Sequence, residues 1–322
     1  MHQIVLNLGA TDHNLLSTKE NGREVLDNPA TMVSKYHYTQ VSYKILGDRN
    51  KMPLSYPLVD VTDVPIENTG LAGDLRIPIS GKDGSTTSAF HLTLQPGEEI
   101  RPHRNDNCEE ISVYLSGHGE NIIEGQSFKV CEGHCIRVPK GVTHQFQNTS
   151  EEPVQMVGFY IGADTLAARG FETIDTVSVA TLNGEHVIHW NDVKPENMDR
   201  NEGWHINDFR LPFGTHNGST TTLFRAQFFP GAVHKKHAHI NCEEIYYLIS
   251  GHGLAGAGDD RVEVTAGQFH YIPSGVEHWL HNLSETEPIH VIGVYIGSGS
   301  VADTGYEYRG DVTSEDIAAR TA

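Results

Sequence analysis

Residues 218–253 read GSTTTLFRAQFFPGAVHKKHAHINCEEIYYLISGHG, and residues 84–119 read GSTTSAFHLTLQPGEEIRPHRNDNCEEISVYLSGHG. The two stretches align without a gap at an offset of 134 residues (218 minus 84), and the same offset still relates Asn148 to Asn282. A repeated unit of this length is typical of a duplicated domain, because solenoid repeats have periods of about 20–50 residues. The sequence therefore predicts two domains that share one fold.

Each unit has the pattern of an all-β domain. In the second unit, the segments FRAQFF, EEIYYLIS, RVEVTA and HYIP are rich in aromatic or β-branched residues and are separated by Pro-Gly, Ser-Gly and other Gly-rich turns. Many short strands joined by such turns are typical of a sandwich or a barrel. Helix signals are few: TLAARGF, which begins at Thr165, and SEDIAAR near the C-terminus, where Ser314 is the expected N-cap.

Four side chains of the second unit are candidate metal ligands. Side chains alternate along a strand, so His237 and His239 face the same side, and Glu244 opens the next strand after a short connection. His278 follows a Pro-Ser-Gly turn further along the chain. Three imidazoles and one carboxylate suit Mn, Fe, Co, Ni or Zn, and the donor types do not rank these metals. The alternative is that the histidines are ordinary surface or core residues.

These residues carry a resemblance to the cupin superfamily, whose two motifs are G-x5-H-x-H-x3-4-E-x6-G and G-x5-P-x-G-x2-H-x3-N. The second unit matches every motif position, with Gly231, His237, His239, Glu244, Gly251, Gly267, Pro273, Gly275, His278 and Asn282. The resemblance implies two double-stranded β-helix (jelly-roll) barrels. It also implies a divalent transition metal in the second barrel, with Fe or Mn as first choices and Ni, Co or Zn as alternatives.

The first unit departs from the motif at one position. His103, Glu110 and His144 match the motif ligands, but Asn105 stands where the second histidine is expected. An amide oxygen is a poorer ligand than imidazole for these metals. We therefore expect the first unit either to bind a weaker second metal through these four residues or to be a structural copy.

Two further residues of the second unit are candidates for substrate contact. Strand alternation places Lys235 on the side of His237 and His239, where an ammonium group could hold a carboxylate or an enolate. The alternative is that Lys235 belongs to a solvated strand edge. Tyr246 shares the side of Glu244 and is either a phenol in the cavity or an aromatic residue of the core.

Other residues are expected to have structural roles. Arg76 and Arg210 recur at the same offset of 134 residues, just before the repeated GST segments. Their recurrence predicts the same structural role in both units. Cys131 and Cys135 flank a histidine in the segment CEGHC, but the corresponding residues of the second unit are not metal ligands. We expect buried thiols here, because a zinc site needs further ligands at suitable spacing.

The composition bears on partners and location. The chain has 42 acidic and 23 basic residues and a net charge of −19, and such a surface repels nucleic-acid phosphates and anionic lipids. The apolar runs are too short to span a bilayer, the N-terminus lacks the pattern of a signal peptide, and four cysteines in 322 residues are no disulfide framework. We therefore expect a cytoplasmic protein with a small-molecule substrate and no nucleic-acid or membrane partner. The sequence leaves open whether the chain forms a homo-oligomer.

The repeat and the motifs predict four regions. Residues 1–70 are expected to form an N-terminal extension of strands and loops, and residues 71–170 the first barrel with an incomplete metal site. Residues 171–205 are expected to form a linker with added strands. Residues 206–322 are expected to form the second barrel with the complete site and a C-terminal helix.

The resemblance implies metal-dependent chemistry in the second barrel. Cupin sites with three histidines and one glutamate are found in quercetin-type dioxygenases, oxalate-oxidising germins, oxalate decarboxylases, and some lyases and isomerases. Our first hypothesis is an oxidoreductase, a dioxygenase acting on a small organic molecule with adjacent oxygen donors. The second is a redox-neutral decarboxylase, lyase or isomerase. The third is a non-enzymatic cupin similar to the duplicated seed storage proteins, which typically lose the ligands retained here.

Overall fold

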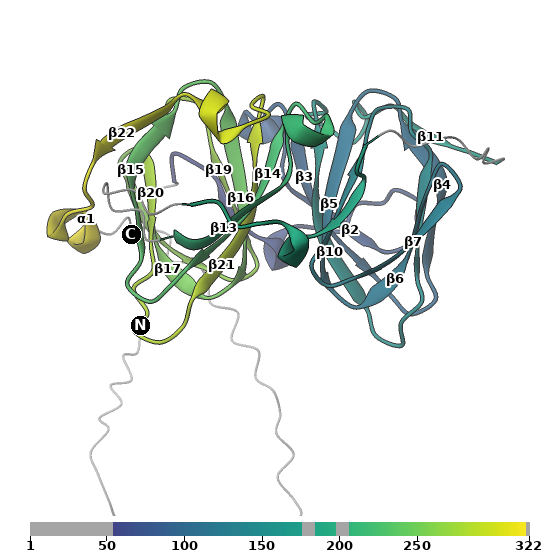
Figure 1. The fold of residues 1–322 in the computed structure, drawn as a ribbon, viewed down its shortest axis with the longest axis horizontal. Helices are drawn as coiled ribbons and strands as arrows, with labels where there is room; N and C mark the ends of the chain where they lie inside the picture. Colours follow the sequence, from purple (N-terminus) through teal and green to yellow (C-terminus); the bar gives the residue numbers. More distant parts are fainter. Residues whose placement is uncertain (1–53, 176–183, 198–205, 320–322) are drawn as a thin grey trace, which may run out of the picture. The chain divides into compact units, whose positions relative to one another are not determined.

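The computed structural model describes residues 54–175, 184–197 and 206–319, and these parts confirm the all-β fold. They form two β-barrels, each built from one six-stranded and one five-stranded sheet (Figure 1). Most of the extension expected over residues 1–70 and part of the linker expected over 171–205 lie outside the described residues. No helix in the described parts is long and apolar enough to cross a membrane.

The first barrel consists of two antiparallel sheets. Its six-stranded sheet has the order β12 (Val187–His189), β8 (His134–Val138), β5 (Glu109–Ser116), β10 (Val154–Ile161), β3 (Ser88–Leu94) and β2 (Asp74–Ile79). Its five-stranded sheet has the order β11 (Phe171–Thr173), β4 (Glu99–Asn105), β9 (His144–Asn148), β6 (His118–Ile123) and β7 (Gln126–Cys131).

The second barrel repeats this arrangement. Its six-stranded sheet has the order β1 (Leu58–Asp60), β19 (Gln268–Ile272), β16 (Glu243–Ser250), β21 (Ile289–Ile296), β14 (Thr222–Phe228) and β13 (Ile206–Phe213). Its five-stranded sheet has the order β18 (Asp260–Thr265), β17 (His252–Ala257), β20 (His278–His281), β15 (Val233–His239) and β22 (Tyr306–Gly310).

Neighbouring residues of β16 fill two different cores. Tyr246 and Leu248 pack inside the second barrel, whereas Ile245 and Tyr247 pack in a cluster that also contains Ile111 of the first barrel. Side chains alternate between the two faces of a strand, so a strand with apolar neighbours on both faces needs apolar residues at successive positions. This explains the nearly continuous apolar run EEIYYLIS.

The segment that precedes each barrel adds a strand to the other barrel. β1 lies before the first barrel in the sequence but pairs with β19 of the second. β12 lies before the second barrel but pairs with β8 of the first. β11, also within the expected linker, pairs with β4 of the first barrel. The two barrels are therefore joined by exchanged strands as well as by side-chain packing.

The recurring arginines hold the turns that follow the exchanged strands. Arg76 donates a hydrogen bond to the Val64 carbonyl, directly after the 3-10 helix η2 (Val61–Asp63). Arg210 donates to the Val193 carbonyl at 2.8 Å, directly after the 3-10 helix η4 (Trp190–Asp192). Both guanidinium groups satisfy carbonyls at the end of a helical turn. The structural role predicted from their recurrence is confirmed.

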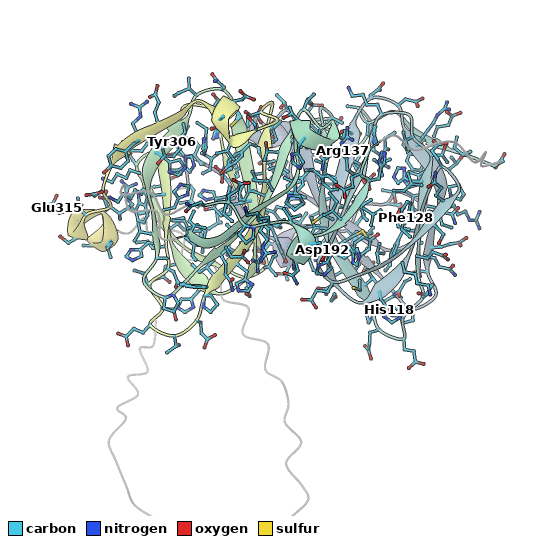
Figure 2. All side chains as sticks on the ribbon, viewed as in Figure 1. His118, Phe128, Arg137, Asp192, Tyr306 and Glu315 are labelled. Atoms are coloured by element: carbon cyan, nitrogen blue, oxygen red, sulfur yellow. The ribbon has the colours of Figure 1, made fainter. Side chains whose placement is uncertain are left out.

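A buried ion pair of the first barrel makes hydrogen bonds to the second barrel. Arg137 Nε lies 2.7 Å from Glu109 Oε2, and both side chains belong to the first barrel. Arg137, which is labelled in Figure 2, also donates to the carbonyls of Asn217 and Gly218. Glu109 accepts a hydrogen bond from Ser219. The repeated GSTT segment at residues 218–221 therefore lies at the interface between the barrels. There the Glu109 carboxylate pairs with Arg137 of the first barrel and accepts a hydrogen bond from Ser219 of the second.

Two details of the helices differ from expectation. The C-terminal helix α1 (Ser314–Ala318) is present, but its N-cap is Thr313, whose side chain accepts a hydrogen bond from the Asp316 backbone N–H. Asp316 in turn accepts from the Thr313 backbone at 2.8 Å, and this capping box makes Ser314 the first helical residue. Residues 165–170 form turns and no helix, and Phe171 begins β11. The backbone of these turns pairs with the loop at Asp106 and Asn107 instead.

Candidate metal centre

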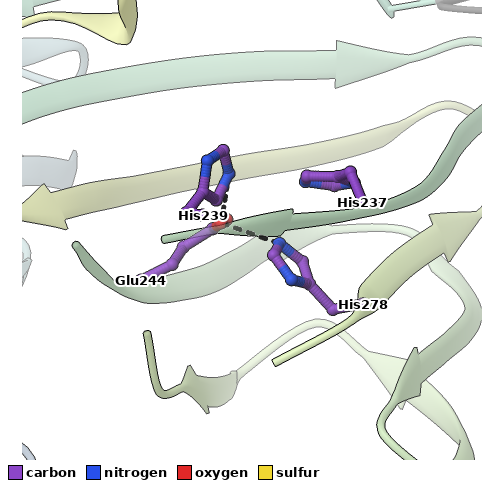
Figure 3. Close-up of side chains that lie close together, drawn as sticks. All are labelled: His237, His239, Glu244 and His278. Atoms are coloured by element: carbon purple, nitrogen blue, oxygen red, sulfur yellow. Dashed lines mark hydrogen bonds and ion pairs between the residues drawn. The ribbon is translucent and has the colours of Figure 1, made fainter. Parts of the chain in front are cut away.

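Four side chains of the second barrel converge at one place. His237 and His239 project from β15, Glu244 from β16 and His278 from β20 (Figure 3). All four are buried, and one ligand atom of each lies within 4.8 Å of those of the others. Glu244 Oε2 lies 3.1 Å from His278 Nε2 and 3.4 Å from His239 Nε2. The structure thus brings together the four residues that the sequence predicted as ligands.

Backbone carbonyls set the orientation of two of these imidazoles. The Nδ1–H of His237 donates to the Lys235 carbonyl at 2.7 Å, and the Nδ1–H of His278 donates to the Val276 carbonyl at 2.9 Å. Because a carbonyl oxygen only accepts, the proton is on Nδ1 and Nε2 keeps its lone pair. This is the tautomer that binds a metal through Nε2.

Burial and mutual contacts determine the charges in the cluster. Desolvation lowers the pKa of His239 below its ordinary value and the pKa of His237 well below it. Burial alone would raise the pKa of Glu244, but the hydrogen bonds and charges of His239 and His278 lower it. Near neutral pH, the imidazoles of His237 and His239 are therefore neutral beside the Glu244 carboxylate, which is the protonation state that binds a divalent metal.

A cavity adjoins the cluster inside the second barrel. It comprises about 420 Å³ of space not occupied by protein atoms, including space open to solvent. Glu244, His278, His234 and Tyr246 contribute polar groups to its wall. The rest of the wall is mainly apolar or aromatic and includes Phe209, Phe224, Phe228, Leu280 and Val291. A wall of this kind suits the apolar body of a small organic molecule.

Tyr246 has both of the roles that the sequence left open. It packs in the core of the second barrel and also lines the cavity. Its hydroxyl lies 2.7 Å from His270 Nδ1. Burial lowers the pKa of His270 to about 3, so this imidazole is neutral near pH 7. This hydrogen bond fixes the phenol ring of Tyr246, because a buried hydroxyl group that loses its hydrogen-bond partner destabilises the fold.

Lys235 lies away from the cavity. The register of β15 shifts between His234 and His237, so the alternation that we expected does not extend to Lys235. His234 instead stacks on His237, with ring centroids 3.8 Å apart, and lines the cavity. Lys235 Nζ lies 2.5 Å from Asp311 and over the ring of Tyr308. The position of His234 at the cavity could not be predicted from the sequence, because a register shift of this kind leaves no mark in a single sequence.

The first barrel contains a similar cluster with one different side chain. His103, Glu110 and His144 place ligand atoms within 4.8 Å of one another. Glu110 Oε2 accepts a hydrogen bond from Asn105 Nδ2 at 2.9 Å and lies 3.2 Å from His144 Nε2. The Asn105 amide thus takes the place that the His239 imidazole has in the second barrel. Burial lowers the pKa of His103 to about 3, which leaves its imidazole neutral.

Asn105→His is expected to add up to about one equivalent of tightly bound metal per chain, because imidazole binds borderline divalent metals better than an amide does. Titration of the wild type and the variant with a divalent metal, followed by elemental analysis, measures the gain. Asn107→His, a change at an exposed position two residues away, is the control and should add none. A wild type that already binds two equivalents tightly would contradict the idea that Asn105 weakens the first site.

A third group of possible ligands lies on the first barrel near the turn between β7 and β8. Cys135 is buried as expected, but the expectation of a buried thiol is wrong for Cys131, which is exposed. Cys131, His134 and His189 place ligand atoms within 4.8 Å of one another. His189, however, accepts from the Asn191 backbone at 3.1 Å and donates to the Glu132 carbonyl at 3.1 Å. Both ring nitrogens of His189 therefore already make hydrogen bonds, so Cys131 and His134 are the two donors of this group that remain for a metal.

Comparison with solved structures supports the duplicated barrel. The structure of oxalate decarboxylase from Bacillus subtilis at pH 4.6 superimposes with a TM-score of 0.62, covering 77% of this chain and 78% of that chain at 15% identity. A second structure of that enzyme, whose title concerns its Mn(II) centres, superimposes with a TM-score of 0.61 at 16% identity and covers 77% of this chain and 79% of that chain. At such low identity the similarity bears on the fold.

Comparison with protein sequences places the family. The cupin domain model matches residues 90–160 and again residues 224–295. Polyketide synthase CurC of Streptomyces cyaneus is 28% identical over 102 residues, which are 31% of this chain and 66% of that protein, just under two thirds of its length. Protein SchB of Streptomyces halstedii is 29% identical over 107 residues, covering 33% of this chain and 76% of that protein. With the cupin domain model matched in both halves and two barrels in the structure, the chain belongs to the cupin superfamily as a duplicated cupin.

Proposed function

We propose that the second barrel is the active site of a metal-dependent oxidoreductase, a dioxygenase acting on a small organic molecule with adjacent oxygen donors. The observation that carries this proposal is the position of the four-ligand cluster beside a cavity with mainly apolar walls. A substrate bound there would keep its carbon skeleton among the aromatic side chains and direct its oxygen atoms toward the cluster.

The residues of the cluster fit a divalent transition metal. Neutral imidazole nitrogens and one carboxylate suit Fe or Mn, and Ni, Co and Zn accept the same donors. His237, His239, Glu244 and His278 would hold the ion, which when bound would supply Lewis acidity and, for Fe or Mn, redox capacity. The protein contributes the tautomers of its imidazoles, the charge of Glu244 and walls that exclude water.

Tyr246 is the residue of the cavity that we propose to contact the substrate directly. Its hydroxyl is fixed by His270 and lies on the same strand face as Glu244, two residues away. It offers a hydrogen bond to an oxygen of the substrate without adding a charge. We assign Lys235 at most an indirect role, since its contact with Asp311 lies outside the cavity lining.

A redox-neutral decarboxylase, lyase or isomerase is the second candidate. It is favoured by the similarity of the fold to oxalate decarboxylase. The lining of the second cavity favours the dioxygenase. Among the described residues it contains no lysine or arginine that could bind a small dianion such as oxalate. The polyketide synthase among the relatives is compatible with a substrate that carries several oxygen atoms on an apolar skeleton.

Oxygen consumption separates these two reactions. With metal-loaded protein and a panel of diols, enols and 2-oxo acids, we expect one substrate class to cause oxygen uptake at an oxygen electrode and to remain unconverted under anaerobic conditions. His239→Ala is expected to show no uptake, whereas Lys235→Ala should retain it. Undiminished turnover of the substrate without oxygen would overturn the dioxygenase proposal in favour of the redox-neutral enzyme.

A further inference from the structure

The cavity of the first barrel is larger than that of the second and has a different chemical character. It comprises about 580 Å³ of space not occupied by protein atoms, compared with about 420 Å³ in the second barrel, both values including space open to solvent. Much of its wall is apolar and includes Leu75, Phe90, Leu92, Phe146 and Met156. Arg169 is the one arginine or lysine among the described residues that line it. His103, Glu110 and His144 of the first-barrel cluster line it too.

Arg169 is buried to an extent that is unusual for an arginine. Only 5% of its surface is exposed, and its guanidinium carbon lies 4.5 Å from the ring centroid of Phe171 and 5.0 Å from that of Tyr160. Nη1 donates a hydrogen bond to the Tyr160 hydroxyl at 3.0 Å. The aromatic rings thus hold the guanidinium group in one position at the cavity wall.

Arg169 makes no direct salt bridge in the described parts of the chain, and the Glu110 carboxylate, which lines the same cavity, interacts with it only over a longer distance. Among the described residues, the ion pairs do not include Arg169. Its Nε is buried and has no hydrogen-bond partner in the described parts of the chain. A buried cation without a direct ion pair is costly, and a ligand that brings a carboxylate to Arg169 would lower that cost.

We propose that the first barrel binds a small carboxylic acid with an apolar body, whose carboxylate pairs with Arg169. The planar guanidinium fork matches the two oxygens of a carboxylate, and such pairs are stronger inside a protein than on its surface. The apolar wall accommodates the rest of the molecule. Asn121 lies at the same wall, and its Oδ1 is buried without a partner. This oxygen only accepts, so it would meet a hydrogen-bond donor elsewhere on the ligand and not the carboxylate.

The second barrel lacks both features on which this site depends. Arg169 corresponds to Thr304 at the offset of 135 residues that applies after Asn148, and the Thr304 hydroxyl donates to a backbone carbonyl of its own loop. Ser112, a small residue at the wall of the first cavity, corresponds to Tyr246. The first barrel therefore has room and a positive charge where the second has a phenol and a neutral side chain. This site does not depend on the activity proposed for the second barrel.

Calorimetric titration of the full-length protein in chloride-free buffer tests the site, with sodium benzoate, neutral benzamide and sodium acetate as probes. Arg169→Met is expected to weaken benzoate binding about tenfold or more while changing benzamide affinity less than about twofold. Ser112→Tyr introduces the side chain of the second barrel and should weaken both aromatic probes. Lys235→Met, which removes a cation of the second barrel, is the control and should leave benzoate affinity unchanged.

Unchanged benzoate affinity in Arg169→Met would overturn the proposal, and acetate binding as tight as benzoate binding would overturn the apolar class of ligand. If Arg169→Met does not fold, as judged by circular dichroism, Ser112→Tyr decides, because it leaves Arg169 and its loop intact. Full benzoate affinity in that variant would place the ligand elsewhere. The same titration with His239→Ala protein separates this site from the second barrel, since benzoate binding should persist there even where oxygen uptake is absent.

Discussion

His239→Ala is expected to lower the tightly bound metal of the second barrel to less than about a tenth of an equivalent. Loss even of a group that only orients a ligand costs about 10–100-fold in metal affinity, and loss of a ligand costs at least as much. The variant also leaves Glu244, which lies 3.4 Å from His239 Nε2, with one fewer imidazole beside it. Elemental analysis after dialysis against a weak chelator measures the effect.

Two histidines serve as controls for this result. His144→Ala alters the first barrel, where the Asn105 amide already replaces an imidazole, and should therefore remove little tightly bound metal. His252→Ala changes an exposed residue at the start of β17 and should remove none. Equal losses in His239→Ala and His144→Ala would show that both barrels bind metal with similar affinity, contrary to our expectation.

Arg137→Met is expected to lower the free energy of unfolding by about 3–5 kcal/mol, because it leaves the carboxylate of Glu109 buried without its partner. Arg137 also satisfies the carbonyls of Asn217 and Gly218 in the other barrel. The variant should therefore weaken both the first barrel and its contact with the second. Urea unfolding followed by circular dichroism and tryptophan fluorescence measures the loss.

Arg104 provides the matched control, since its contacts with Asp106 and Glu172 lie at the exposed surface of the same barrel. Arg104→Ala should cost less than about 1 kcal/mol. Replacing Glu109 and Arg137 together by methionine should recover part of the loss, because no unpaired charge is then left in the interface. An Arg137→Met protein as stable as Arg104→Ala would refute this account of the interface.

Local spacing in the sequence was sufficient for the all-β class and for three ligands of the second barrel, and it occurs twice in the chain. The barrel type and the place of His278 beside these ligands were expected from the resemblance to cupins. His237 and His239 share a face because strands alternate with a period of two, and Glu244 follows after a short connection, so their proximity needs little long-range information. The same spacing in the first unit located His103, Glu110 and His144, and one substitution, Asn105, marked the difference between the barrels.

The tertiary structure decided the features that depend on contacts between distant parts of the chain. A register shift in β15 placed His234 beside His237 and moved Lys235 to Asp311. Turns after β10, where a helix was expected, brought Arg169 to the cavity of the first barrel. Strand exchange between the barrels and the contact of Glu109 with Ser219 join residues more than 100 positions apart. Propensity and spacing describe neighbours along a chain, whereas these contacts form because buried charges and strand edges need partners wherever the fold supplies them.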